Sequence, residues 1–405
     1  MKAITTTFYT VLSAALVLGC KDHCSQNPQT SSVHDPTRLE KIAAVQQEMI
    51  TKGQVGSNHV VIFKDGQTIY DSIVNSGLHG DQDITHETIF PIWSMTKPIT
   101  TVAALILLEE GKFLLDDPLE KYLPEMANLQ CLDAEGNMYP CNTQVTIFDI
   151  LSHQSGWGYY PRNIDGHNTL LSDLWYKDLE DFSRSMASIP LEFEPGTRYL
   201  YGVNTSIVGR LIEVVSKKSL YQFMKERIFE PLEMDNTKFH LTADDRKRLQ
   251  PLLRAEGDSI KFYREQYNEL SYSEDSNLYF GGAGLVSTTK DYGNFCAMLL
   301  NHGAYKGKQI ISPASIKLMA TPVNPELENG TFIGSSTAFS LFNLTNPIRD
   351  GGLSPKGIFG WGGYHGTLFW IDQKNNLYGL VMDRSSQSAR EMFTKVRIAT
   401  YQALY

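Results

Sequence analysis

Residues 91–111 read PIWSMTKPITTVAALILLEEG, and this stretch predicts a buried helix with a serine at its mouth. Its second half is apolar on nearly all sides, which is typical of a helix enclosed in a core, and Gly111 is a natural C-terminal stop. Pro98 fits only the first turn, where its missing N–H costs nothing. Ser94 and Lys97 therefore fall at or just inside the N-terminus, on one face of the helix.

The pairing of Ser94 with Lys97 is typical of nucleophilic catalysis. A serine hydroxyl is a weak nucleophile until a base takes its proton, and a lysine removed from water can be neutral enough to do so. The N–H groups at the start of the same helix would face the oxygen that becomes negative on attack. For Ser94 alone a helix cap is the simpler interpretation, so the hypothesis depends on the rest of the chain.

Ser287 and Lys290 repeat the Ser-x-x-Lys spacing later in the chain. There Thr288 and Asp291 have capping-box spacing before a second expected helix. No aromatic or glycine-rich segment is left over to complete a site around them. We therefore interpret this second copy as a helix cap.

The first 36 residues are predicted to be an export signal and a tether. Residues 1–19 combine a basic start with an apolar stretch too short to span a membrane, and Cys20 follows a glycine as in a bacterial lipobox. An ordinary signal peptide with an incidental cysteine is the alternative. On the first interpretation, residues 20–36 form a lipidated tether. The protein then lies in the bacterial cell envelope, on the periplasmic side of the outer membrane, held to the membrane by its lipid anchor.

Composition excludes several classes of function. The net charge of −9 gives no electrostatic reason to bind nucleic acid, and the chain has no glycine-rich phosphate loop. No Cys/His cluster has zinc spacing, so we expect no metal and no other cofactor. Cys131 and Cys141 bracket a loop and either pair in an oxidising compartment or stay as isolated thiols. The oligomeric state is not defined by the sequence.

Both ends of the body, residues 37–405, predict a helix and a pair of strands. The elements found from periodicity and turn residues are a helix at 37–49, strands at 59–63 and 67–70, strands at 367–371 and 377–382, and a helix at 389–404. The economical packing is one antiparallel sheet made from both ends, with helices over its faces. We therefore expect an α/β (α+β) fold, with an α/β part at about 37–120 and 281–405 and an inserted all-helical subdomain at about 121–280.

Two further stretches can complete a site around Ser94. Residues 193–204, FEPGTRYLYGVN, carry a Pro-Gly turn and then Tyr201 just before a helix, although tyrosine is ordinarily a packing residue. Residues 359–370, FGWGGYHGTLFW, place glycines beside a strand edge. Such glycines permit the close backbone approach that a substrate carbonyl seeking an N–H donor requires. A structural bulge is the alternative for this second stretch.

Together these stretches resemble the serine hydrolases of the beta-lactamase and penicillin-binding protein superfamily. The wording SMTKP at 94–98 is closest to the class-C-like, family VIII carboxylesterases. VTIFDILSHQSG at 145–156 and the stretch 280–300 are similar to scaffold segments of the same group. The resemblance covers about 40–400 and implies an acyl-enzyme at Ser94, in a groove between the α/β part and the helical insert.

Tyr201 matches the second-motif tyrosine of the esterases. The resemblance thus makes Ser94, Lys97 and Tyr201 the catalytic residues, with either Lys97 or Tyr201 as the base. The lactamase form Tyr-x-Asn is absent, because Val203 occupies the asparagine position and Asn204 comes one residue late. A role for that asparagine in holding a lactam side-chain amide is therefore in doubt.

The third motif also follows the esterases. Lys-Thr-Gly does not occur in the chain, and the matching strand is WGGY at 361–364. Backbone N–H groups of Ser94 and Tyr364 would share the acyl oxygen. A shifted match that places HGT at 365–367 on the motif favours a peptidase. The expected oxyanion and substrate-binding residues are Ser94, Trp361, Gly362, Gly363, Tyr364 and His365.

Loss of the motif lysine bears on the substrate. Beta-lactams and D-Ala peptides carry a carboxylate, and a charge-assisted hydrogen bond to it contributes roughly 1.5–3 kcal/mol. Trp361 offers one indole donor and no charge, so a small neutral acyl ester is favoured. The alternatives are a beta-lactamase or D-amino-acid peptidase on the same site, or a non-catalytic lipoprotein that binds cell-wall peptide.

Overall fold

The computed structural model describes residues 34–160, 176–256, 259–264, 270–324, 330–386 and 389–404. The predicted signal peptide and the tether up to Val33, with Cys20, lie outside these residues. The chain from His34 onward forms one compact unit. Among the described helices, none is both long and apolar enough to cross a membrane.

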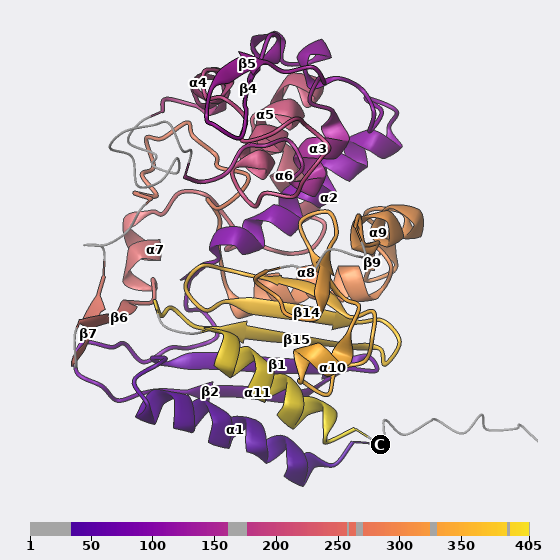
Figure 1. The fold of residues 1–405 in the computed structure, drawn as a ribbon. Helices are drawn as coiled ribbons and strands as arrows, with labels where there is room; N and C mark the ends of the chain where they lie inside the picture. Colours follow the sequence, from indigo (N-terminus) through magenta and orange to yellow (C-terminus); the bar gives the residue numbers. More distant parts are fainter. Residues whose placement is uncertain are drawn as a thin grey trace, which may run out of the picture. The chain divides into compact units, whose positions relative to one another are not determined.

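One seven-stranded antiparallel sheet is built from the two ends of the chain (Figure 1). Its strands, in spatial order, are β11 (Ser335–Thr337), β12 (Phe342–Leu344), β13 (Phe359–Gly362), β14 (Leu368–Asp372), β15 (Leu377–Met382), β1 (Asn58–Lys64) and β2 (Gln67–Val74). N-terminal β1 pairs with C-terminal β15, and Val61 lies opposite Leu380. The predicted antiparallel sheet made from both ends is therefore confirmed.

Helices cover both faces of this sheet. Helices α1 (Pro36–Thr51) and α11 (Ala389–Tyr401) lie side by side on one face (Figure 1). On β14, the Trp370 ring contacts Phe393 of α11 at 5.7 Å, whereas the neighbouring Phe369 ring contacts Tyr292 of α8 (Thr289–Leu300) at 5.3 Å. Successive strand residues point to opposite faces, so α8 covers the face opposite α11. This double cover explains why β14 and β15 are buried along their whole length.

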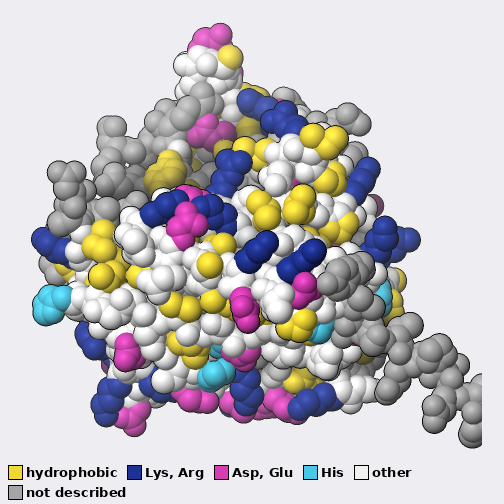
Figure 2. Space-filling model, turned by 90° about the horizontal axis from the view of Figure 1, so that it is seen from below, with side chains coloured by type: hydrophobic (Ala, Val, Ile, Leu, Met, Phe, Trp, Pro, Cys, Tyr) yellow, Lys and Arg dark blue, Asp and Glu magenta, His cyan; other side chains and the backbone are white. Residues whose placement is uncertain are grey.

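The outer surface of this region carries charges of both signs. Figure 2 shows acidic and basic side chains interspersed on the face seen from below. Lys52, the C-cap residue of α1, and Lys395 of α11 each lie between Glu48 and Glu391, with N–O distances of 2.6–2.9 Å. These exposed pairs join the two helices, although surface ion pairs add little stability individually.

The stretch 121–280, called the helical stretch below, contains several helices that are connected by irregular segments. Its helices are α3 (Ile147–Ser152), α4 (Leu179–Ala187), α5 (Asn204–Ser216), α6 (Leu220–Met224), the π-helical η4 (Lys225–Phe229) and α7 (Ala243–Lys247), with the 3-10 turn η3 (Pro124–Met126) and, at its boundary, η2 (Leu119–Lys121). It also contains two hairpins, β4 (Gln130–Leu132) with β5 (Met138–Pro140) and β6 (Leu252–Glu256) with β7 (Ser259–Tyr263). Cys131 and Cys141, at the first hairpin, form a disulfide.

The remaining described elements are short apart from one helix. They are β3 (Phe90–Pro91), β8 (Val286–Ser287), β9 (Ala304–Tyr305), β10 (Lys308–Gln309), α9 (Pro313–Ala320) and α10 (Pro347–Asp350). The long one is α2 (Thr96–Glu109), which is buried from Thr96 to Leu107 and packs against α5 and α6 of the helical stretch. The predicted buried helix is thus confirmed, with its start two residues earlier than Pro98.

The second Ser-x-x-Lys stretch is a helix start, as predicted. Thr288 is the N-cap of α8, and its hydroxyl accepts the N–H of Asp291 at 3.2 Å. Ser287 lies just before the cap in β8, where its buried hydroxyl contacts the Thr237 hydroxyl at 2.8 Å. Ser287 therefore has a packing partner of its own and does not face Lys290, which is exposed.

Candidate active site

Ser94 lies in a 3-10 turn, η1 (Trp93–Met95), that leads directly into α2. It is partly exposed, whereas the residues on both sides are buried. Trp93 has φ of +46°, a left-handed conformation that is strained for a bulky residue. The turn is held by the N–H of Met95, which donates to the Ile92 carbonyl at 2.9 Å. The strained turn presents the Ser94 side chain at the helix mouth.

Lys97 is fully buried and is held by neutral oxygens. Its Nζ donates to the Gly282 carbonyl at 2.6 Å, to Tyr159 Oη at 2.7 Å and to Ser94 Oγ at 3.3 Å. None of the described carboxylates forms an ion pair with it. Burial lowers the pKa of Lys97, and the neighbouring Tyr201 opposes this shift only in part. The amine can therefore lose its proton more readily than an ordinary lysine.

Tyr159 is the site residue that sequence reasoning missed. It lies three residues beyond the 145–156 stretch, which was interpreted only as a scaffold. Burial raises the pKa of Tyr159 well above its ordinary value, Tyr201 raises it further, and a hydrogen bond with Ser94 opposes the shift. Tyr159 thus keeps its proton near neutral pH and contacts both Ser94 and Lys97. A phenol in this position can pass a proton between the two side chains.

Tyr201 also reaches the site, mainly through its ring. The Lys97 Nζ lies 4.8 Å from the centre of the Tyr201 ring, and the Tyr159 ring lies 5.5 Å away. On its other sides the Tyr201 ring meets Trp361 at 5.6 Å and His153 at 5.0 Å. The structure therefore brings together Ser94, Lys97 and Tyr201, as the resemblance implied, and adds Tyr159 beside them.

A glycine contact brings the two tyrosines together. A Cβ at Gly202 would lie 2.2 Å from the Trp157 carbonyl oxygen and 2.6 Å from the Gly158 Cα. Such distances are impossible for a real side chain, so only glycine at position 202 allows the two backbone segments to touch. Tyr201 and Tyr159, one residue away on each segment, are adjacent as a consequence.

Asn204 has a structural position rather than an exposed one. It is fully buried; its Nδ2 lies 3.2 Å from His153 Nδ1 and 3.1 Å from the Trp157 carbonyl oxygen, and its Oδ1 accepts a hydrogen bond from Ser155. These contacts fix the 153–157 segment that carries the chain to Tyr159. Burial and the charge of Lys97 lower the pKa of His153 well below its ordinary value, so this imidazole is neutral.

The turn between β13 and β14 packs against the segment that leads into the Ser94 turn. A Cβ at Gly363 would lie 2.6 Å from the Ile92 carbonyl oxygen, so the glycine permits this close contact, and the Gly363 N–H donates to the Thr367 carbonyl at 2.7 Å. The Tyr364 ring lies 5.7 Å from the Trp93 ring and is 67 % exposed. Two residues of the predicted substrate-binding set, Gly363 and Tyr364, thus lie beside the segment that presents Ser94.

Trp361 and His365 occupy different surroundings at this turn. Trp361 is buried, with its ring between Tyr201 and Phe332, at 5.6 and 5.1 Å, and a Cβ on the following Gly362 would lie 2.8 Å from Leu368. His365 is also buried, and its ring lies 5.3 Å from Trp93. Burial, with the charges of two nearby arginines, lowers the pKa of His365 to about 3.

His365 therefore stays neutral, and no hydrogen bond joins it to Ser94 or Lys97 within the part of the chain that the structure describes. Of the two residues, it is Trp361 whose ring contacts Tyr201, at 5.6 Å.

A helical stretch over an antiparallel sheet, with serine and lysine at the mouth of a buried helix, defines a protein of the beta-lactamase and penicillin-binding protein class. The sequence profile described as Beta-lactamase matches residues 42–401 of this chain. The chain belongs to the beta-lactamase family, whose members include hydrolases and acyltransferases.

Similar proteins span most of the chain. Protein Rv1367c of Mycobacterium tuberculosis is 30 % identical over 319 residues, which cover 72 % of this chain and 76 % of that protein. Lovastatin esterase of Penicillium rubens is 28 % identical over 318 residues, which cover 71 % of this chain and 77 % of the esterase. The solved structure of EstCE1, described as a hydrolase with promiscuous acyltransferase activity, superposes with a TM-score of 0.75 at 24 % identity, over 90 % of this chain and 99 % of EstCE1.

Proposed function

We propose that this protein is a serine hydrolase that forms an acyl-enzyme at Ser94 and cleaves small carboxylic esters. The observation that carries the proposal is the environment of Lys97, a buried amine whose Nζ contacts both Ser94 Oγ and Tyr159 Oη. A buried lysine with no carboxylate partner is costly for the fold unless it serves a purpose. Deprotonation of a serine nucleophile is such a purpose.

Lys97 is the base in this mechanism. Ser94 Oγ attacks the acyl carbonyl carbon while its proton passes to the neutral Lys97 amine, directly over 3.3 Å or through Tyr159. The Lys97 ammonium then returns a proton to the leaving alcohol as the ester bond breaks. In the second half, Lys97 takes a proton from water, the water oxygen attacks the acyl carbon, and Ser94 leaves with that proton restored.

Tyr159 acts as a relay rather than as the resident base, because its raised pKa keeps the phenol protonated. Tyr201 is assigned to hold the amine between the two rings, where its hydroxyl also tends to keep Lys97 charged. The oxyanion is assigned to the backbone N–H groups of Ser94 and Tyr364. The close packing of Gly363 on Ile92 supports this, since it brings the strand turn against the start of the nucleophile turn.

A neutral acyl group is the proposed substrate class. The resemblance assigns Trp361 to the position of the lysine that would pair with a substrate carboxylate, and the Trp361 ring packs against Tyr201. Lys97 is buried and committed to Ser94, so it is not available as a counter-ion. The similarity to a lovastatin esterase, whose name describes ester cleavage, supports the same choice.

The test compares two substrates on one protein. Turnover of nitrophenyl butyrate with little or no turnover of a chromogenic cephalosporin is the expected result. The intact mass after brief exposure to an ester panel should show one acyl group, located on the peptide that contains Ser94. Preference for the cephalosporin or for a D-Ala peptide would replace the esterase proposal with a lactamase or peptidase, and no turnover and no adduct with any of them would leave a binding protein.

We also propose that the protein is an exported lipoprotein of the bacterial cell envelope. The support is the basic and apolar signal at 1–19 with Cys20 directly after Gly19. Cys20→Ser should release the protein from the membrane fraction, because its lipid is the anchor proposed here. Cys24→Ser, four residues away, is the matched control and should stay in the membrane fraction. Retention of the Cys20→Ser variant would contradict the proposal.

A further inference from the structure

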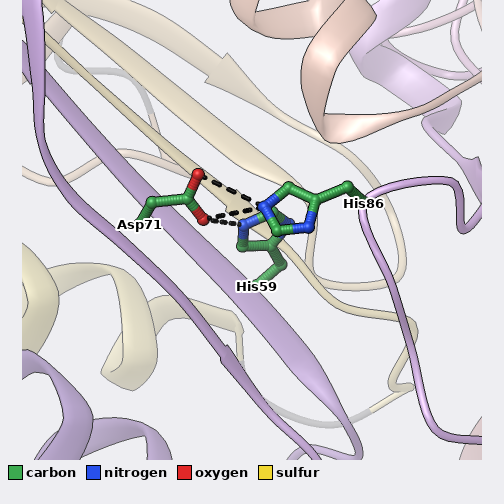
Figure 3. A group of neighbouring side chains, drawn as sticks. All are labelled: His59, Asp71 and His86. Atoms are coloured by element: carbon green, nitrogen blue, oxygen red, sulfur yellow. Dashed lines mark hydrogen bonds and ion pairs between the residues drawn. The ribbon is translucent and has the colours of Figure 1, made fainter.

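Three side chains with metal-binding atoms meet at the β2 edge of the sheet (Figure 3). His59 of β1 points its Nε2 at Asp71 of β2, 2.6 Å from Oδ1. His86, in the segment between β2 and β3, places its Nε2 3.3 Å from Oδ1 and 3.4 Å from Oδ2 of the same carboxylate. The ligand atoms of the three residues all lie within 4.8 Å of one another.

Local structure fixes each of these positions. In the antiparallel pair β1–β2, Val61 lies opposite Asp71, so His59 is a diagonal neighbour of Asp71 on the same face. His86 lies in a short turn closed on both sides, where the Thr88 N–H donates to the Thr85 carbonyl at 3.1 Å and the Thr85 N–H to the Thr88 hydroxyl at 2.9 Å. The convergence is therefore built by two rigid strands and a closed turn.

A hydrogen bond joins His59 to Asp71, and His86 is joined to them by the Asp71 carboxylate and by an edge-to-face contact with the His59 ring at 5.0 Å. The His86 side chain is 63 % exposed, so burial of its ring does not hold it there. Two imidazoles and one carboxylate form a donor set that suits zinc, with water in a fourth position. We propose that His59, Asp71 and His86 bind a zinc ion, with one nitrogen from each histidine and one carboxylate oxygen.

The two distances to the Asp71 carboxylate suit such an ion after a small adjustment. With metal bonds of about 2.0–2.1 Å, ligand atoms of a tetrahedral site lie roughly 3.3 Å apart. The pair His86–Asp71 is already at 3.3 Å, and the pair His59–Asp71 at 2.6 Å must open. Asp71 is 40 % exposed, so its carboxylate can move outward without disturbing the core. The same exposure gives the ion an entry path from solvent.

The surroundings of the three ligands also indicate how tightly zinc should bind. A metal-bound histidine usually donates its second N–H to an acceptor, which orients the ring and strengthens the bond. The His59 Nδ1 is buried and has no such partner among the described residues. The carboxylate is the only anionic ligand, and two of the three side chains are exposed. We therefore expect a dissociation constant on the order of micromolar, far weaker than that of a structural zinc finger.

Zinc at this position would link three parts of the chain. It would join β1 and β2 to the segment that continues into β3 and then to η1, which carries Ser94. None of the three ligands contacts Ser94, Lys97 or Tyr159 in the described structure. The expected effect is therefore on stability, since an ion that binds only the folded state raises the melting temperature.

The experiment titrates the full-length chain, stripped of metal, with zinc. Calorimetry of the wild type should show one bound zinc ion, and this binding should be weakened or lost in His86→Gln. The melting temperature of the wild type should rise by a few degrees as zinc saturates it. Cobalt is the spectroscopic probe, because its visible absorption bands report tetrahedral coordination by nitrogen and oxygen. His86→Gln and Asp71→Asn should each weaken zinc binding by about tenfold or more, and both should lose the cobalt bands.

His79→Gln is the matched control, because His79 is an exposed histidine of the same connecting segment and lies outside the cluster. It should bind zinc like the wild type. Unchanged zinc affinity in both His86→Gln and Asp71→Asn would overturn the proposal and place the ion elsewhere. Absence of any zinc-dependent shift in melting temperature, with no cobalt bands in the wild type, would overturn it as well.

Discussion

The chain contains the string Ser-x-x-Lys twice at the start of a helix, and the two copies have different surroundings. At the first, Lys97 is fully buried and its Nζ reaches Ser94 Oγ. At the second, Lys290 is exposed and the Ser287 hydroxyl contacts Thr237 instead. The two copies share the spacing but not these contacts, so the spacing alone does not create a site.

What differs is the placement of the serine and the segments packed against it. Ser94 precedes its helix in a strained turn, and glycine contacts bring Tyr159 and Tyr201 together beside Lys97 and the β13–β14 turn against Ile92. Ser287 precedes its helix in a short strand paired with β3, and Thr288 takes the capping role. The two helix mouths therefore differ in which neighbours can approach them, and at the first copy glycines permit that approach.

The largest difference is expected from removing each serine hydroxyl. Ser94→Ala should lower ester turnover on the order of 10⁴-fold or more and abolish labelling by a fluorophosphonate, because the nucleophile acts as part of a unit. Ser287→Ala, the matched control, should keep both. Steady-state kinetics and the intact mass of the labelled protein provide the measurement. Labelling that depends on Ser287 would reverse the assignment of the two copies.

Replacing each lysine should give the next largest difference in turnover. Lys97→Arg keeps a positive charge and removes the group that can be deprotonated, so turnover should fall by about 10²–10⁴-fold. Lys290→Arg, on the exposed copy, should leave turnover unchanged. The direction in which kcat/KM changes with pH follows from the burial of Lys97, which lowers its pKa below 10.5. Because the neutral amine is the active form, kcat/KM should rise with pH through a midpoint below 10.5, and Lys97→Arg should lose that rising limb.

Among the residues that the structure describes, no tyrosine contacts Lys290 as Tyr159 and Tyr201 contact Lys97, so removing these two hydroxyls tests the difference between the copies. Tyr159→Phe and Tyr201→Phe should each slow turnover, and for Tyr159 the factor should be on the order of 10², because a relay to Lys97 is lost. Tyr199→Phe is the control, since its ring meets His153 rather than Lys97. Wild-type kcat in Tyr159→Phe would remove Tyr159 from the proton path and leave the direct transfer to Lys97.

The parts of the fold that were predicted correctly have strong local signals. The hairpin of β1 and β2 was found from Asp65-Gly66, and both residues have positive φ, at +50° and +86°. The helix expected just after Tyr201 is α5, which begins at Asn204 and has its apolar residues on one helical face. The short strands β11 and β12 were not predicted, since three residues are too few to show a period.

The site was only partly predictable, because much of it depends on contacts between distant segments. Ser94 and Lys97 share one helix start and were visible as a motif. Tyr159 joins them through the contact of Gly158 with Gly202, which no spacing in one segment reveals. Local composition could have indicated Tyr159, because SGWGYY at 155–160 alternates glycine and aromatic residues at the end of a segment that resembles the family. Likewise, the pairing of Cys131 with Cys141 depends on the β4–β5 hairpin, which was not predicted from the sequence.

The smallest expected effect concerns the capping role that distinguishes the second copy. The Thr288 hydroxyl accepts the N–H of Asp291 at 3.2 Å, and both residues are buried. Thr288→Ala leaves that N–H without its partner, so the free energy of unfolding should fall by about 1 kcal/mol. Denaturant unfolding provides the measurement. Thr96→Ala would be an unsuitable control, because Thr96 lies next to the turn that carries Ser94.

The better control for this cap is Ser312→Ala, the N-cap of α9, whose hydroxyl accepts the N–H of Ser315 at 3.2 Å. Both cap variants should lose a similar free energy of unfolding, and both should keep the ester turnover of the wild type, because neither hydroxyl contacts Lys97. The comparison would break if Thr288→Ala lowered turnover as strongly as Tyr159→Phe while its stability stayed near that of Ser312→Ala. The second Ser-x-x-Lys would then have to act in catalysis, which its exposed lysine and its capped helix start argue against.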